Sequence, residues 1–97
     1  MDLLAEAIRN RRPLTFFYDG HQRVVLPVAV GYKWTTRNYL LRAYQVGGTT
    51  ASGHRPPWRL FKVPRIVGLQ VGAEPFDAVP PGYHRGDQGM TRVFAQL

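Results

Sequence analysis

The sequence contains no cysteine, one serine (Ser52) and only six acidic residues in 97. Without cysteine the chain forms no disulfide and has no thiol nucleophile or cysteine-ligated zinc, which is typical of a cytoplasmic protein. No apolar run approaches the roughly 20 residues of a membrane-spanning helix, so we expect no membrane partner. Ser52 and the scattered acids place no pair of carboxylates on one element for acid–base chemistry. We therefore expect a protein that is not an enzyme.

Metal-binding residues are also sparse. The three histidines, His21, His54 and His84, stand far apart in the sequence and lack the paired spacing of a metal site. Each is interpreted as a surface residue, and only His21 is kept as a marginal ligand contact because it lies close to Arg23. The sequence predicts no metal site and no cofactor.

Positive charge is what the chain has in excess. Thirteen basic residues, most of them arginines, against six acids give a net charge of +7. Polyanions, above all nucleic acid, are therefore the first partners to consider. Charge alone leaves an acidic protein or an acidic lipid surface open.

The pattern along the chain predicts one domain over residues 1–97. It divides into an N-terminal helix at 1–13, a β-rich body at 14–74 and a C-terminal extension at 75–97. The helix is expected to end at Pro13, which cannot continue a hydrogen-bonded helix. One face of the helix is predicted to carry an apolar stripe of Leu3, Leu4, Ala7 and Ile8.

Five segments have the composition of β-strands, and they read as a strongly bent sheet or partly open barrel. Asp19-Gly20 is the strongest short hairpin signal in the sequence. Pro27 indicates an edge position or a bulge, because proline donates no hydrogen bond to a neighbouring strand. The predicted strands are residues 14–18, 23–31, 39–46, 58–63 and 66–71.

Simple alternation assigns the faces of these strands. In the second strand, Val24, Leu26, Val28 and Val30 are expected on one face. In the fourth, Arg59 and Phe61 share a face, and Pro64 is expected to stop or bulge the strand and so redirect Arg65.

Two further segments complete the prediction. The connection 47–57 is rich in glycine and proline and is expected to be a mobile loop. A short closing helix is expected at 88–96, because one helical face would gather Met90, Val93, Phe94 and Leu97.

Taken in order, these segments resemble the WYL domains of bacterial regulators. A Phe17-Tyr18 strand end is followed by Arg23-Val24-Val25-Leu26-Pro27. Asn38-Tyr39-Leu40 stands in the place of the family's Trp-Tyr-Leu, and residues 59–66 look like its Arg-x-Phe-x-Leu-Asp-Arg-Ile. The resemblance covers roughly residues 4–77.

The resemblance implies an SH3-like or Sm-like five-stranded small barrel with flanking helices, so that the expected fold class is mainly β (α+β). It also implies sensing of oligonucleotides or nucleotide-type ligands through a basic, aromatic-edged surface. Asn38 replaces the family's Trp and Pro64 its usual Asp, which removes a stacking residue and a possible partner for Arg65. No winged helix precedes the domain here, so we expect a stand-alone module.

Carried over position by position, and extended to Lys62 by the alternation of basic and aromatic residues, the resemblance gives seven candidate binding residues. They are Tyr18, Arg23, Tyr39, Arg42, Arg59, Lys62 and Arg65. Arginines suit phosphate groups, and exposed aromatics suit stacked bases.

Two hypotheses follow. The first is a module that binds short single-stranded nucleic acid or a nucleotide-type anion, in a bacterial regulatory or defence context. The second is a protein-interaction module that forms a homodimer or joins a larger regulator complex. Against the first, Arg59 and Arg65 could pair with Glu74 or Asp77, and aromatics such as Phe61 could simply be core.

Overall fold

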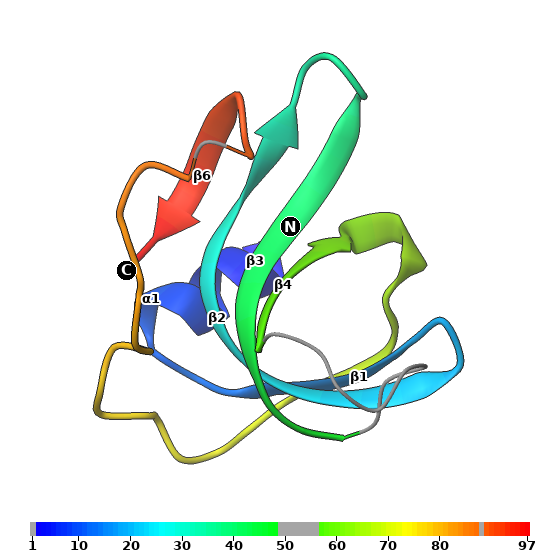
Figure 1. Ribbon diagram of the computed structural model, residues 1–97. Helices are drawn as coiled ribbons and strands as arrows, with labels where there is room; N and C mark the ends of the chain where they lie inside the picture. Colours follow the sequence, from blue (N-terminus) through cyan, green and yellow to red (C-terminus); the bar gives the residue numbers. More distant parts are fainter. Residues whose placement is uncertain (1, 49–56, 88) are drawn as a thin grey trace.

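The computed structural model describes residues 2–48, 57–87 and 89–97, and within them the chain is mainly β with one short helix. Most of the predicted loop 47–57, with Ser52 and His54, lies outside these residues. The elements in order are α1 (Asp2–Arg9), β1 (Leu14–Tyr18), β2 (His21–Lys33), β3 (Asn38–Gly48), β4 (Trp58–Lys62), the 3-10 turn η1 (Val63–Arg65), β5 (Val67–Val71) and β6 (Arg92–Gln96) (Figure 1).

The strands form one antiparallel sheet in which β2 is the organising strand. The order is β4-β3-β2-β1-β5, and β6 also pairs with β2. One edge of β2 is therefore shared, by β1 along residues 21–25 and by β6 along 29–32, while β3 occupies the other edge. Over the described part of the chain the sheet is not closed, and β4 and β5 form its two ends. All five predicted strands are confirmed, and β6 is a sixth.

The β1–β2 connection is the predicted hairpin. Tyr18 pairs with His21, and the two residues between them, Asp19 and Gly20, have φ angles of 52° and 77°. Two consecutive positive φ angles are what a tight two-residue hairpin turn requires, and Asp-Gly tolerates them well.

A bulge in β2 changes which side chains face the core. The pairing with β3 shifts between Pro27 and Ala29, so Val28 is the extra residue. Because a bulge inserts one residue, the alternation changes phase across it. Val25 and Val30 consequently lie in the same core, while Val28 lies in another. The bulge was expected at Pro27, but the prediction that Val28 and Val30 share a face is wrong.

The larger core lies beneath α1. It joins residues of the helix to β1, β2, β3, β4 and β6, with Phe16 and Phe61 in edge-to-face contact at 5.0 Å. Burying each of these rings stabilises the fold by about 2 kcal/mol. The helix stripe is confirmed at Leu4, Ala7 and Ile8, but Leu3 is exposed.

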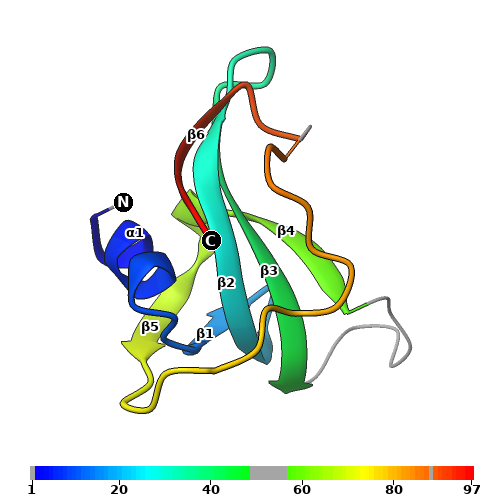
Figure 2. The ribbon, with the colours of Figure 1, turned by 90° about the vertical axis from the view of Figure 1, so that its left-hand side faces the viewer.

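A second core lies on the opposite side of the sheet. Residues 80–87, which we call the strap, return across this side, and α1 and the strap flank the β2–β3 pair (Figure 2). The residues of this core are Val28, Ala29, Leu40 and Met90, with Trp58, Tyr83, Val93 and Leu97 packed against them.

The predicted closing helix at 88–96 is wrong, because residues 92–96 form β6. The strand lies very close to β2: a Cβ atom built on Gly31 would lie 2.1 Å from the carbonyl oxygen of Arg92. Only a glycine at that position leaves room for β6. Hydrogen bonding to the open edge of β2 favours a strand here over the helix that the spacing of the apolar residues predicted. Of the helices in the residues described, none is long and apolar enough to cross a membrane.

Candidate functional site

Three arginines converge on one pair of aromatic rings, and we call this group the arginine cluster. The rings of Tyr18 and Phe61 meet edge to face at 4.9 Å. The guanidinium carbon of Arg23 lies 5.9 Å from both ring centroids, that of Arg59 lies 5.9 Å from Phe61, and that of Arg65 lies 5.1 Å from Tyr18. At such distances a cation is attracted to the face of a ring. Cations from β2, β4 and η1 are thus gathered at the end of β1.

Local structure explains the convergence. Arg59 and Phe61 are two positions apart in β4 and share a face. Pro64 ends the strand in the 3-10 turn η1, which redirects Arg65 as expected. The backbone N–H of Lys62 donates a hydrogen bond of 3.0 Å to Oη of Tyr18, and this bond joins β4 to the end of β1.

Arg23 forms the base of the cluster, with only 2% of the residue exposed. Its guanidinium donates to the carbonyl oxygen of Tyr18 at 3.2 Å and to Oε1 of Gln45 at 3.4 Å. A buried cation is tolerated only when its N–H groups are bonded. Arg23 is therefore a fixed charge within the fold.

Arg65 lies at the surface of the cluster. Arg65 forms an ion pair with Asp19, and the two side chains are 52% and 46% exposed. The alternative, in which Arg65 pairs with Glu74 or Asp77, is wrong about the partner, because the acid that Arg65 contacts is Asp19 of the β1–β2 turn. Lys62, also expected in the site, is exposed, but it follows Phe61 in β4, so its side chain points to the opposite face of the strand and does not join the cluster. Because the ion pair is open to solvent, an anion that binds Arg65 more tightly can displace the carboxylate of Asp19.

Tyr39 lies apart from the cluster. Its ring is 4.9 Å from that of Tyr32 and 6.2 Å from that of Phe94, near the pairing of β2 with β6. The residue is 42% exposed. Tyr39 therefore does not share a site with Tyr18.

Arg42 lies on the opposite face of β3 from the buried Leu41 and Ala43. It donates two hydrogen bonds to Asp87 of the strap, Nε–H to Oδ2 at 2.7 Å and Nη2–H to Oδ1 at 3.2 Å. The expectation that Arg42 joins Arg59 and Arg65 in one anion site is not met by this geometry.

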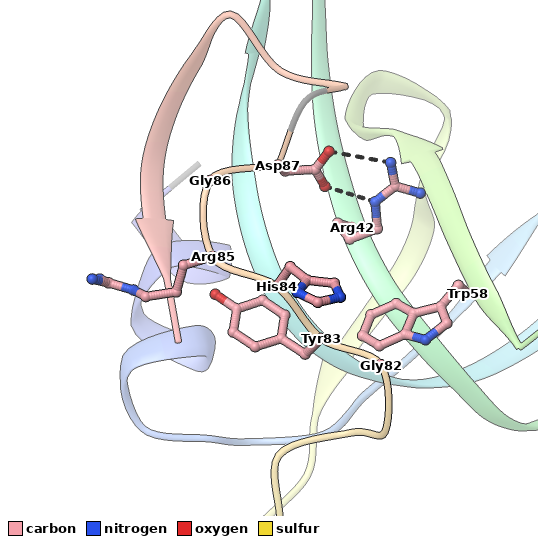
Figure 3. Close-up of a pocket in the computed structure, with 8 residues that line it drawn as sticks. All are labelled: Arg42, Trp58, Gly82, Tyr83, His84, Arg85, Gly86 and Asp87. Carbon is pink, nitrogen blue, oxygen red and sulfur yellow. Dashed lines mark hydrogen bonds and ion pairs between the residues drawn. The ribbon is translucent and has the colours of Figure 1, made fainter.

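A pocket of about 500 Å³ lies beside this ion pair (Figure 3). Aromatic side chains supply one part of its wall and the Arg42–Asp87 pair another. The lining residues are Arg42, Trp58, Gly82, Tyr83, His84, Arg85, Gly86 and Asp87.

Two groups of the pocket have shifted pKa values. Burial acts to raise the pKa of Asp87, but hydrogen bonds from Arg42 and the Gly89 amide, with the charge of Arg42, hold it below its ordinary value. Burial raises the pKa of Tyr83, although nearby Arg85 opposes this effect. Asp87 is therefore ionised and Tyr83 neutral at pH 7.

Sequence reasoning missed several of these groups. No pocket was predicted at Trp58, which packs against the second core and also lines the pocket, on the face of β4 opposite to Arg59. The strap residues carry no motif, so Tyr83 and Asp87 gave no signal. No group of three or more potential metal ligands is found in the residues that the structure describes.

Comparison with protein-family models, with curated proteins and with solved structures finds no match to this chain. The geometry of the arginine cluster and of the pocket is therefore the basis on which function is argued.

Proposed function

We propose that this chain is a WYL-type module, with its bent sheet arranged as an SH3-like or Sm-like small barrel, that binds short single-stranded nucleic acid or a nucleotide-type anion in a bacterial regulatory or defence context. The observation that supports this is the convergence of Arg23, Arg59 and Arg65 on the Tyr18–Phe61 ring pair.

The charge of the cluster suits a phosphate-bearing ligand. Three cations (Arg23, Arg59 and Arg65) gather near one described acid, Asp19. Guanidinium groups bind phosphate bidentately, and each phosphate neutralised releases counterions, which makes the affinity salt-dependent.

The aromatic rings have a supporting role in this site. Tyr18 and Phe61 are buried, so their faces are covered and do not receive a base. Their contacts instead fix the positions of the guanidinium planes. Arginine planes themselves stack on bases, so Arg59 and Arg65 supply both the phosphate contacts and the stacking.

Fluorescence anisotropy with labelled single-stranded oligonucleotides tests the proposal at 50 and 200 mM salt. The double variant Arg59→Ala/Arg65→Ala is expected to bind at least about tenfold more weakly, since two phosphate contacts are lost. The matched control is Arg9→Ala/Arg92→Ala, which removes the same charge from exposed positions elsewhere. Absence of binding at 50 mM salt, or equal weakening in both variants, would overturn the proposal.

The alternative, an interaction module, keeps one supporting observation. β5 is an end strand whose residues are mostly exposed, including Val67 and Val71, and an open strand edge can pair with another chain. The apolar residues at the C-terminal end offer less support, because Met90 belongs to the second core and Val93 packs against it. Light scattering over a range of concentrations tests this: a strict monomer would exclude self-association.

A further inference from the structure

The pocket beside Arg42 is separate from the arginine cluster. Trp58 and Arg59 are successive residues of β4, so their side chains point to opposite faces of the sheet. Trp58 lines the pocket, whereas Arg59 contacts Phe61 of the cluster. The β3–β4 pair therefore has a cationic site on one face and an aromatic pocket on the other.

The aromatic wall is held in place by hydrogen bonds. The indole N–H of Trp58 donates to the carbonyl oxygen of Pro81 at 2.9 Å, and the ring packs edge to face on Tyr44 at 5.2 Å. The hydroxyl of Tyr83 donates to the carbonyl oxygen of Leu97 at 2.9 Å. A wall that is already fixed loses little conformational freedom when a ligand binds.

The strap follows the pocket because two glycines let it turn. Gly82 and Gly86 have φ angles of +83° and +77°, which other residues rarely adopt. A Cβ atom on Gly82 would lie 3.4 Å from Nε1 of Trp58. The strap therefore lies against Trp58 at Gly82, and in the view of Figure 3 the rings of Tyr83, His84 and Trp58 are seen below the Arg42–Asp87 pair.

The other part of the wall is polar and offers both kinds of hydrogen-bonding group. The side chains of Arg42 and Asp87 are 28% and 10% exposed, so the pair is partly open to the pocket. Arg42 retains N–H groups beyond the two that it donates to Asp87. Oδ1 of Asp87 already accepts from Arg42 and from the Gly89 amide, whereas Oδ2 can accept a further bond. A purely apolar ligand would cover these charged groups without satisfying them.

We infer that this pocket binds a nucleobase, as part of a nucleoside monophosphate or of a nucleotide at a strand end. A nucleobase is planar, so it stacks on Trp58. Its edge carries both hydrogen-bond acceptors, which suit the N–H groups of Arg42, and donors, which suit the carboxylate of Asp87. The volume lies within the range of small-molecule sites. Arg85 adds a positive charge at the edge of the pocket, but its guanidinium points away from the rings and its Nε–H donates to the carbonyl oxygen of Leu97, so this charge favours a phosphate outside the base site (Figure 3). The inference goes beyond the proposed function, because it needs neither Arg59 nor Arg65.

Tryptophan fluorescence tests this directly. The chain has two tryptophans, and Trp34 is 73% exposed, so the Trp34→Phe variant leaves Trp58 as the only indole reporter. We expect adenosine or guanosine monophosphate to quench this fluorescence saturably, while ribose 5-phosphate, which lacks the base, leaves it unchanged. The absence of saturable quenching in the folded variant, or equal quenching by ribose 5-phosphate, overturns the inference.

Two further variants in the Trp34→Phe background locate the site. Arg42→Ala/Asp87→Ala removes both partners of the ion pair and so leaves no buried charge alone; it is expected to weaken binding at least fivefold. If circular dichroism shows that this variant is unfolded, His84→Ala, at an exposed position of the wall, is expected to weaken binding severalfold. Arg59→Ala/Arg65→Ala is expected to retain the quenching. The inference is overturned if Arg59→Ala/Arg65→Ala loses the quenching, or if the pocket variants bind as tightly as the parent. If Arg59→Ala/Arg65→Ala loses only oligonucleotide binding, the result bears on the proposed function alone.

Discussion

Removing the carboxylate of Asp19 is predicted to strengthen the binding of anions at the arginine cluster. Asp19 is the described ion-pair partner of Arg65, and it also occupies a turn position with φ of 52°. The substitution Asp19→Asn keeps a residue that tolerates this φ, and Asn-Gly is a favoured sequence for this turn. The variant therefore changes the charge of the cluster without disturbing the hairpin.

The size of both effects follows from the exposure of the pair. Because the two side chains are 52% and 46% exposed, their ion pair stabilises the fold by only about 0–1 kcal/mol, and the melting temperature should change by a few degrees at most. In the parent chain Asp19 competes with phosphate for Arg65, so removing the carboxylate completes this phosphate contact and adds up to about 0.7 to the slope of log K against log salt for a single strand. Between 50 and 200 mM salt, that slope makes the loss of affinity up to about threefold larger than in the parent chain.

Anisotropy titrations across this salt range measure the slope, and Asp77→Asn is the matched control. Asp77 is exposed and its backbone carbonyl, not its side chain, accepts a hydrogen bond of 3.0 Å from Arg11. Both variants raise the net charge by one, so a general charge effect appears equally in the two. If Asp19→Asn leaves the slope unchanged, or resembles Asp77→Asn, then Arg65 does not contact phosphate and the reasoning fails.

Three other predictions concern stability. The pKa of Asp87 is depressed in the folded state, so its contribution to the free energy of unfolding is present above the ordinary carboxyl pKa and is lost as pH falls through the folded value. In urea unfolding, Asp87→Asn should therefore reduce the dependence of stability on pH below about pH 4 and cost about 1–2 kcal/mol at pH 7. Gly31→Ala should destabilise the fold by about 2–3 kcal/mol and increase hydrogen exchange in β6, because its Cβ would meet the carbonyl of Arg92; unchanged exchange there would contradict this close approach. Tyr18→Phe keeps the ring but leaves the Lys62 N–H without its acceptor, so a loss of about 1 kcal/mol is expected in the same unfolding assay, and no loss would show that water replaces the hydroxyl.

The sequence predicts the local features of the fold well. The Asp19-Gly20 hairpin, the end of β4 before Pro64 and the five strands each depend on residues next to one another in the chain. Face assignment failed at Val28, because one inserted residue reverses the alternation that follows it. The position of a bulge is visible in the sequence as a proline, but which residue becomes the extra one depends on pairing with β3.

The site was predictable only where alternation held. Arg59 and Phe61 were placed on one face, and the structure brings them together with Tyr18. Arg42 was grouped with Arg59 from the family resemblance, although the buried neighbours of Arg42 in β3 direct it to the other face. Asp87 was beyond sequence reasoning, because the path of the strap depends on long-range contacts.

The shared edge of β2 bears on the order in which the molecule assembles. The β1–β2 and β2–β3 pairings are closed by short turns, whereas the β2–β6 pairing joins residues as distant as Ala29 and Gln96. Closing a longer segment costs more entropy, so β6 is expected to join β2 after the three-stranded meander has formed. Contacts made after the rate-limiting step slow unfolding and leave the folding rate nearly unchanged. The unfolding rate of the native molecule is therefore expected to depend on the β2–β6 pairing, where Gly31 allows the two strands to approach closely.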